Sequence, residues 1–209
     1  MRALGILAQA PVPGRVKARL ADEVGPSVAA EVYWQLGRRV VAAVAAPGLR
    51  TTVWYAPAHE AAFVREWLEG VGRVELRPQP AGTLGVRLTF AFARHFQDGA
   101  ARSGSGAVIV GTDCPGVDRR LVNEAFTALT RFDLVMGPTL DGGYYLLGLR
   151  SPAPELFHDV RWGTGAVAAQ TRAHAAALGL RTQLLRPLRD VDTARDARAL
   201  GLLTTIDGT

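Results

Sequence analysis

The sequence predicts an α/β fold, a three-layer sandwich with a mainly parallel mixed sheet. Apolar segments typical of strands take turns along the chain with amphipathic segments that have helical spacing. One strand-like segment, 107–110, has four apolar residues flanked by glycines, which is typical of a central strand buried on both faces. With 209 residues and 48% hydrophobic content the chain is long enough for one core, so we expect a single domain over residues 1–209.

The expected elements follow in chain order from these patterns. Residues 2–9 form an apolar run that predicts the first strand. An apolar residue recurs every four positions from Val28 to Val44, and Pro47-Gly48 ends the pattern, so 26–46 is expected to be a long helix. Further strands are expected at 51–56, 73–77, 107–110, 133–137, 144–149 and near 182–185. Further helices are expected at about 63–70, 84–96, 121–129, 167–178 and 194–203, with an irregular segment at 151–162.

The composition excludes several classes of protein. The formal net charge is +5, from 24 basic and 19 acidic residues, but no basic run is longer than a pair, so we expect a small anionic ligand and no nucleic-acid partner. No apolar stretch approaches the ~18 residues of a membrane span. The apolar run before Gln9 is too short for the hydrophobic region of a secretory signal, so we expect none. The single cysteine, Cys114, excludes an internal disulfide and favours a cytoplasmic location. The oligomeric state is left open.

Three cations follow the first expected strand. Within residues 8–20, Arg15, Lys17 and Arg19 are spaced two apart, and Lys17 is the only lysine of the chain. If this segment is extended, all three point the same way and converge on one polyphosphate, while Gly14 lets the backbone come close. The alternative is a solvated loop face. The segment matches neither the Walker nor the Rossmann nucleotide loop.

A carboxylate directly follows the central strand, in Gly111-Thr112-Asp113-Cys114-Pro115. In such sheets the ligand lies outside the carboxyl ends of the strands, so Asp113 is expected to hold Mg²⁺ or Mn²⁺ there. The alternative, that Asp113 caps the next helix, suits Asp118 better.

Two further acidic segments are expected at the same edge. Asp141-Gly142-Gly143 is either a plain hairpin turn or a turn that leaves space for a ligand beside Asp141. Asp190 and Asp192 lie on one side of an extended piece, where like charges repel unless a cation lies between them, and the alternative is that Asp192 or Thr193 caps the following helix.

The sequence leaves the role of Trp162 open and indicates no catalytic role for the histidines. The Trp162 ring either packs against a substrate or covers the edge of the core. The histidines lack acidic or cysteine partners at ligand spacing, so no catalytic histidine is expected.

Taken together, these segments resemble the bacterial radical-SAM/selenodomain-associated transferase 1 family. The matching motifs are 10–20, 111–115, 137–145, 162–164 and 190–193, in order over nearly the whole chain. The resemblance implies the nucleotide-diphospho-sugar transferase (GT-A) fold, with 2-phospho-L-lactate guanylyltransferase and molybdenum cofactor guanylyltransferase as distant relatives. Two positions depart: Gln9 replaces the usual lysine and Ala18 the usual threonine. Ala18 lacks the hydroxyl that could form one phosphate hydrogen bond, but the three cations remain.

The resemblance implies a Mg²⁺- or Mn²⁺-dependent transferase that uses an activated nucleotide and a small-molecule acceptor. The expected reaction is glycosyl transfer from a nucleotide sugar. One alternative is nucleotidyl transfer from a nucleoside triphosphate to a phosphorylated small molecule, and a third is a non-enzymatic anion-binding module. The expected site residues are, for catalysis, Asp113, Asp141 and Lys17; for the nucleotide, Ala8, Pro13, Gly14, Arg15, Lys17, Arg19, Gly82 and Thr112; for the metal, Asp113 and Asp192; and for the substrate, Gly142, Gly143, Tyr144, Trp162 and Asp190.

Overall fold

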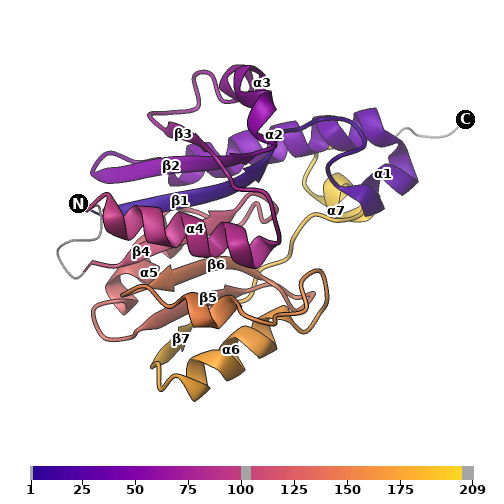
Figure 1. Ribbon diagram of the computed structural model, residues 1–209. Coiled ribbons are helices and arrows are strands. Elements are labelled where there is room, and N and C mark those ends of the chain that lie inside the picture. Colours follow the sequence, from indigo (N-terminus) through magenta and orange to yellow (C-terminus); the bar gives the residue numbers. More distant parts are fainter. Residues whose placement is uncertain (1, 100–104, 204–209) are drawn as a thin grey trace, which may run out of the picture.

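A mixed sheet of seven strands runs through the computed structural model, which describes residues 2–99 and 105–203 (Figure 1). The strand order is β3-β2-β1-β4-β6-β5-β7, and β6 is antiparallel to its neighbours β4 and β5, whereas the other pairs are parallel. The strands are β1 Arg2–Gln9, β2 Leu49–Ala56, β3 Glu75–Pro78, β4 Ala107–Gly111, β5 Leu134–Pro138, β6 Tyr144–Leu149 and β7 Thr182–Leu184. The mainly parallel mixed sheet predicted from the sequence is therefore confirmed.

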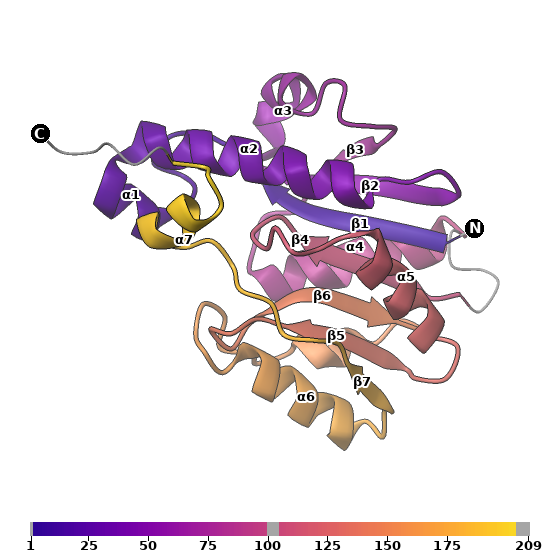
Figure 2. The same cartoon turned by 180° about the vertical axis from the view of Figure 1, so that it is seen from behind.

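Helices cover both faces of the sheet. The α-helices are α1 Ala18–Val24, α2 Pro26–Val44, α3 Ala61–Trp67, α4 Leu84–Gln97, α5 Arg119–Ala128, α6 Val167–Ala177 and α7 Ala194–Ala199. Short 3₁₀ turns lie at Ala58–Glu60 and Pro154–Phe157. Helix α4 lies on one face (Figure 1), and α2 and α5 lie on the other (Figure 2). No helix of the described residues is long and apolar enough to cross a membrane.

Alternation along the strands supplies both halves of the core. In β4, Val108 and Val110 face the α2 and α5 side, whereas Ile109 packs with Phe92 of α4 on the other side. All of these side chains are at most 2% exposed. The predicted burial of this strand on both faces is thus confirmed.

Two elements differ from the sequence expectations. The segment that begins α1 was expected to belong to an extended loop. The structure instead forms a seven-residue helix directly after Lys17. Helix α7 was expected to reach about residue 203 but ends at Ala199, because Gly201 (φ 67°) turns the chain and the Leu202 N–H donates back to the Ala197 carbonyl. Helices α1 and α7, which are far apart in the sequence, contact each other near the edge of the sheet at which β1 ends (Figure 2).

The carboxyl ends of β1, β4, β5 and β7 meet at this edge. Because β6 runs antiparallel, its first residue, Tyr144, lies at the same edge. The isolated bridge between Thr139 and Leu188 ties the segment after β5 to the segment after β7. The loops that carry the sequence motifs therefore converge on one side of the molecule.

His95 of α4 is a buried member of the core. Trp54 Nε1 donates to His95 Nε2 at 3.1 Å, and Gly5 leaves room for the ring, since a Cβ there would lie 2.7 Å from His95 Nε2. Burial, followed by the charge of Arg77, lowers the pKa of His95 to about 4. The neutral imidazole is the form that the fold accommodates.

We expect His95 to make stability depend on pH. Its folded pKa lies below the ordinary value near 6.5, so its contribution is fully present above pH 6.5 and is lost as the pH falls toward 4. Between pH 7.5 and pH 5 this amounts to about 2 kcal/mol of unfolding free energy. Denaturant unfolding of wild type and His95→Gln at both pH values measures it. The glutamine retains an acceptor for Trp54 but does not titrate, so equal pH losses in both proteins would contradict the prediction.

Candidate functional site

A cavity of about 640 Å³ lies at the edge where the strands end. Its charged lining comes from the segments after β1, β4, β5 and β7, which are far apart in the sequence. These side chains are Arg15, Lys17, Arg19, Asp113, Asp141, Asp190 and Asp192. The structure thus brings together the cations and carboxylates that the sequence analysis selected.

Lys17 is buried at the centre of this charged lining. It precedes α1 with a left-handed backbone (φ 51°), which turns its side chain into the cavity, where only 5% of it is exposed. Its ammonium nitrogen contacts Oδ1 of Asp113 and lies 3.4 Å from Oδ1 of Asp192. Burial alone lowers the pKa of Lys17, but these two carboxylates outweigh it and raise the pKa, so the ammonium group stays charged.

Arg19 and Arg15 lie nearer the surface. Arg19 pairs with Oδ2 of Asp192, and 68% of its side chain is exposed. Arg15 belongs to an exposed turn at residues 13–15. The expectation that an extended segment aligns the three cations is wrong, because the chain turns, passes through the left-handed Lys17 and enters α1. All three cations nevertheless line the same cavity.

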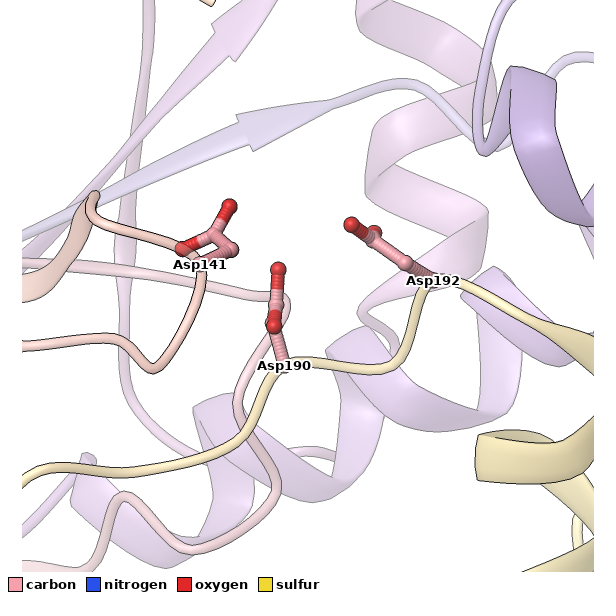
Figure 3. A group of neighbouring side chains, drawn as sticks. All are labelled: Asp141, Asp190 and Asp192. Carbon is pink, nitrogen blue, oxygen red and sulfur yellow. The ribbon is translucent and has the colours of Figure 1, made fainter. Parts of the chain in front are cut away.

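Three carboxylates gather beside the cations. One oxygen each from Asp141, Asp190 and Asp192 lie within 4.8 Å of one another, and Figure 3 shows these side chains around a common space. Burial, together with the nearby charges of Asp192 and Asp141, raises the pKa of Asp190 to about 6. Burial is the larger cause of this shift, and repulsion from the neighbouring carboxylates adds to it.

Asp141 is held in place by its own turn. Its Oδ1 accepts hydrogen bonds from the Thr139 hydroxyl and from the Gly143 backbone N–H, the latter at 3.1 Å. Burial alone would raise the pKa of Asp141, but these hydrogen bonds and the charge of Arg19 outweigh it and lower the pKa. Asp141 is therefore ionised at neutral pH.

Asp113 is connected to the acidic group through Asp192. The Asp113 carbonyl accepts from the Val191 N–H at 3.0 Å, which fixes the 190–192 segment against the end of β4. Half of the Asp113 side chain is exposed to the cavity. Asp113 and Asp192, the expected metal pair, thus contact the same ammonium nitrogen, whereas Asp113 is not a member of the group of three carboxylates.

The glycines near the rim make room for the chain itself. A Cβ on Gly142 would lie 2.1 Å from the Gly165 carbonyl oxygen, and one on Gly85 would lie 2.9 Å from the Trp162 ring. The expected space for a ligand beside Gly142 is therefore filled by Gly165. The segment with Trp162 is fixed between α4 and the Asp141 turn, and Trp162 and Gly143 line the cavity.

A smaller cavity of about 200 Å³ lies beneath α4 and adjoins the first. It contains residues that the sequence analysis did not select. Gln79 donates to the carbonyls of Ala8 (2.8 Å) and Trp54 (2.6 Å), and the Tyr33 hydroxyl lies 2.7 Å from the Thr112 hydroxyl. Tyr33 also accepts from the Gln9 N–H and places its ring 6.0 Å from the Lys17 ammonium group.

Several residues expected in the site lie away from its charged lining. Ala8 and Thr112 line the smaller cavity, but the Ala8 carbonyl and the Thr112 hydroxyl already have protein partners. Among the described residues, four selected ones line neither cavity: Pro13, Gly14, Gly82 and Gly142.

The capping roles weighed in the sequence analysis are settled in part. Asp118 caps α5 by accepting from the Leu121 N–H, and Thr193 forms a capping box with Asp196. None of Asp113, Asp190 and Asp192 is the N-cap residue of a described helix. Cys114 is buried, and burial raises the pKa of its thiol, which makes it a poor nucleophile.

The sequence profile of one protein family matches residues 39–164, more than half of the chain. The chain belongs to this family, DUF2064, described as uncharacterized protein conserved in bacteria. Comparison with curated proteins gave no match. Membership of DUF2064 does not by itself indicate a reaction, so the function is inferred from the geometry of the cavity.

Solved structures share the fold of this DUF2064 chain. A protein from Desulfovibrio desulfuricans G20, provisionally named a nucleotide-diphospho-sugar transferase, is 30% identical over 96% of this chain and 87% of its own, with a TM-score of 0.85. A cytidylyltransferase from Leptospira borgpetersenii serovar Hardjo-bovis is 15% identical (96% and 85% covered, TM-score 0.59). The CMP:2-keto-3-deoxy-manno-octonic acid synthetase complexed with CTP is 11% identical (96% and 97% covered, TM-score 0.54). The last two show similarity of fold alone.

Proposed function

We propose that the chain is a metal-dependent transferase that uses a nucleotide sugar as donor and a hydroxyl-bearing small molecule as acceptor. The observation that carries the proposal is the convergence of three cations and four carboxylates on one cavity at the carboxyl edge of the sheet. The name of the Desulfovibrio relative supports the donor class. The resemblance of the motifs to the radical-SAM/selenodomain-associated transferase 1 family supports it too.

The carboxylates fit a hard divalent cation. Asp113 and Asp192 already converge on one positive charge, the Lys17 ammonium nitrogen, and Asp190 lies beside Asp192. An all-oxygen donor set suits Mg²⁺ or Mn²⁺. Asp113 and Asp192, with Asp190 next to them, would hold such an ion, which when bound would neutralise charge on the diphosphate.

The other side chains divide the remaining tasks. Arg15, Lys17 and Arg19 bind the phosphate oxygens, and Trp162 provides a wall for the sugar. An acceptor hydroxyl attacks the anomeric carbon, the bond from that carbon to the diphosphate oxygen breaks, and the nucleoside diphosphate leaves with the electron pair. Asp141 accepts the hydroxyl proton, because it is ionised and exposed at the rim. Positioning and electrostatics supply most of the rate.

A second candidate function is nucleotidyl transfer. Three cations are more than a diphosphate needs and suit a triphosphate. Here an acceptor phosphate oxygen attacks the α-phosphorus of a nucleoside triphosphate, and pyrophosphate leaves toward the cations. A non-enzymatic anion-binding module, the third possibility, has no use for four carboxylates at the same cavity.

Donor titration tests the proposal and separates the two reactions. With Mg²⁺ present, we expect UDP-glucose, GDP-mannose or a related sugar nucleotide to raise the thermal midpoint in a concentration-dependent way, because a ligand that binds only the folded state stabilises it. GTP and CTP serve as the competing series. Preference for a triphosphate, with pyrophosphate released when a phosphorylated acceptor is added, would replace glycosyl by nucleotidyl transfer. If neither the sugar nucleotides nor the triphosphates bind, the proposed function is rejected.

A further inference from the structure

Asp192 has no free carboxylate oxygen in this structure. Its Oδ1 lies 3.4 Å from the Lys17 ammonium nitrogen, and its Oδ2 is paired with Arg19. A divalent cation that binds Asp192 therefore competes with these two cations for the carboxylate oxygens. Asp141 and Asp190 form no ion pair among the described residues, so Asp192 is the member of the group of three carboxylates at which a metal ion meets competing cations.

The two cations differ in how easily they can leave. Lys17 is 5% exposed, has a second carboxylate contact on Asp113 and is fixed by its left-handed backbone. Arg19 is 68% exposed, lies in the first turn of α1 and has a long flexible side chain that also lines the cavity. Arg19 is thus the cation that can turn away from Asp192 while remaining within the site.

We infer that Arg19 exchanges Asp192 for a nucleotide phosphate, so that the site takes the metal and the nucleotide together and binds free divalent cations poorly. The inference rests on the proposed function and adds the form in which the donor is recognised. A phosphate oxygen gives the guanidinium group a new anionic partner, and the metal takes the oxygen that Arg19 releases. Arg19 and Asp192 each gain a new partner when their ion pair breaks. The metal and the nucleotide therefore strengthen each other's binding.

The exchange predicts opposite effects of one substitution. In Arg19→Gln the Oδ2 atom of Asp192 is free, so Mn²⁺ alone should bind about fivefold tighter than in wild type, the effect of an ion pair of this exposure. The same variant should bind nucleotide more weakly, and its gain in Mn²⁺ affinity on adding nucleotide should be smaller. A residue with a merely structural role would not tighten metal binding.

Arg15→Gln is the matched control. Arg15 lines the same cavity, but no described residue forms an ion pair with it. Free Mn²⁺ is measured by electron paramagnetic resonance, first without nucleotide and then with each nucleotide of the donor series, at 0.15 M salt to screen long-range charge effects. We expect Arg15→Gln to stay within about twofold of wild type for Mn²⁺ alone, because screening leaves only close charges effective.

The outcomes separate the exchange from the proposed function. Tighter Mn²⁺ binding in Arg19→Gln and not in Arg15→Gln supports the exchange. Unchanged binding in Arg19→Gln, or equal tightening in both variants, overturns it and leaves the nucleotide function standing. If wild type binds no nucleotide even with Mn²⁺ present, the proposed function falls and the exchange with it.

Discussion

Replacing Asp192 with asparagine is expected to weaken Mg²⁺-dependent nucleotide binding by about 100-fold or more, the effect of removing a charged partner from a desolvated cluster. Asp192 belongs both to the group of three carboxylates and to the ion pairs with Lys17 and Arg19. The amide keeps the size of the side chain but removes its charge. In the proposed site the metal would lose a ligand, and Lys17 loses one of its two counter-charges. Calorimetric titration of the donor series with and without Mg²⁺ measures the effect.

Asp133→Asn provides the control for this substitution. Asp133 is also a carboxylate with an arginine partner, since Arg181 Nε donates to it at 2.9 Å. It precedes β5 at the opposite edge of the sheet from the cavity. We expect its replacement to leave the dependence on Mg²⁺ unchanged. If Asp192→Asn binds nucleotide in the presence of Mg²⁺ within about threefold of wild type, the carboxylate of Asp192 serves the two ion pairs and does not bind a metal.

The elements that the sequence predicted well are those with an unambiguous apolar pattern. Strand β4 is a short apolar run between glycines, and α2 repeats apolar residues over five turns before Pro47-Gly48. Helix α1 was missed because cations at every second position suggested an extended segment, and because seven residues hold only one buried side chain, Leu20. The usable signal was Gly25 followed by Pro26, which ends one helix and begins the next.

The site was predictable at the level of residue types but not of partners. Chemistry-bearing residues after apolar strands identified the edge, because parallel strands end together. The partners of Lys17 could not be read from the sequence, since Asp192 lies 175 positions away and the contact depends on the 190–192 segment joining the end of β4. Tyr33 carries no signal of its own: its position on the buried side of α2 is that of an ordinary core residue.

Lys17→Ala is expected both to lose nucleotide binding and to destabilise the unbound protein. Alanine has the same left-handed backbone cost as lysine, because both carry a Cβ, so the substitution isolates the side chain. Without the ammonium group, Asp113 and Asp192 are left as close carboxylates with no cation between them. Removing one partner of a fully buried pair costs about 3–5 kcal/mol, and since Asp113 is half exposed we expect about 1–2 kcal/mol of unfolding free energy here.

Two measurements decide whether Lys17 acts on the ligand, on the fold or on both. Denaturant unfolding without ligand gives the destabilisation, and titration of the donor series gives the phosphate contact, whose loss should weaken binding by roughly 10-fold or more. Mg²⁺ should partly restore the stability of Lys17→Ala, because a divalent cation can take the position between the two carboxylates, whereas wild type should respond little without nucleotide. An alanine variant that unfolds as wild type does and binds nucleotide within twofold would show that the buried ammonium group is neither a phosphate ligand nor the charge that holds Asp113 and Asp192 together.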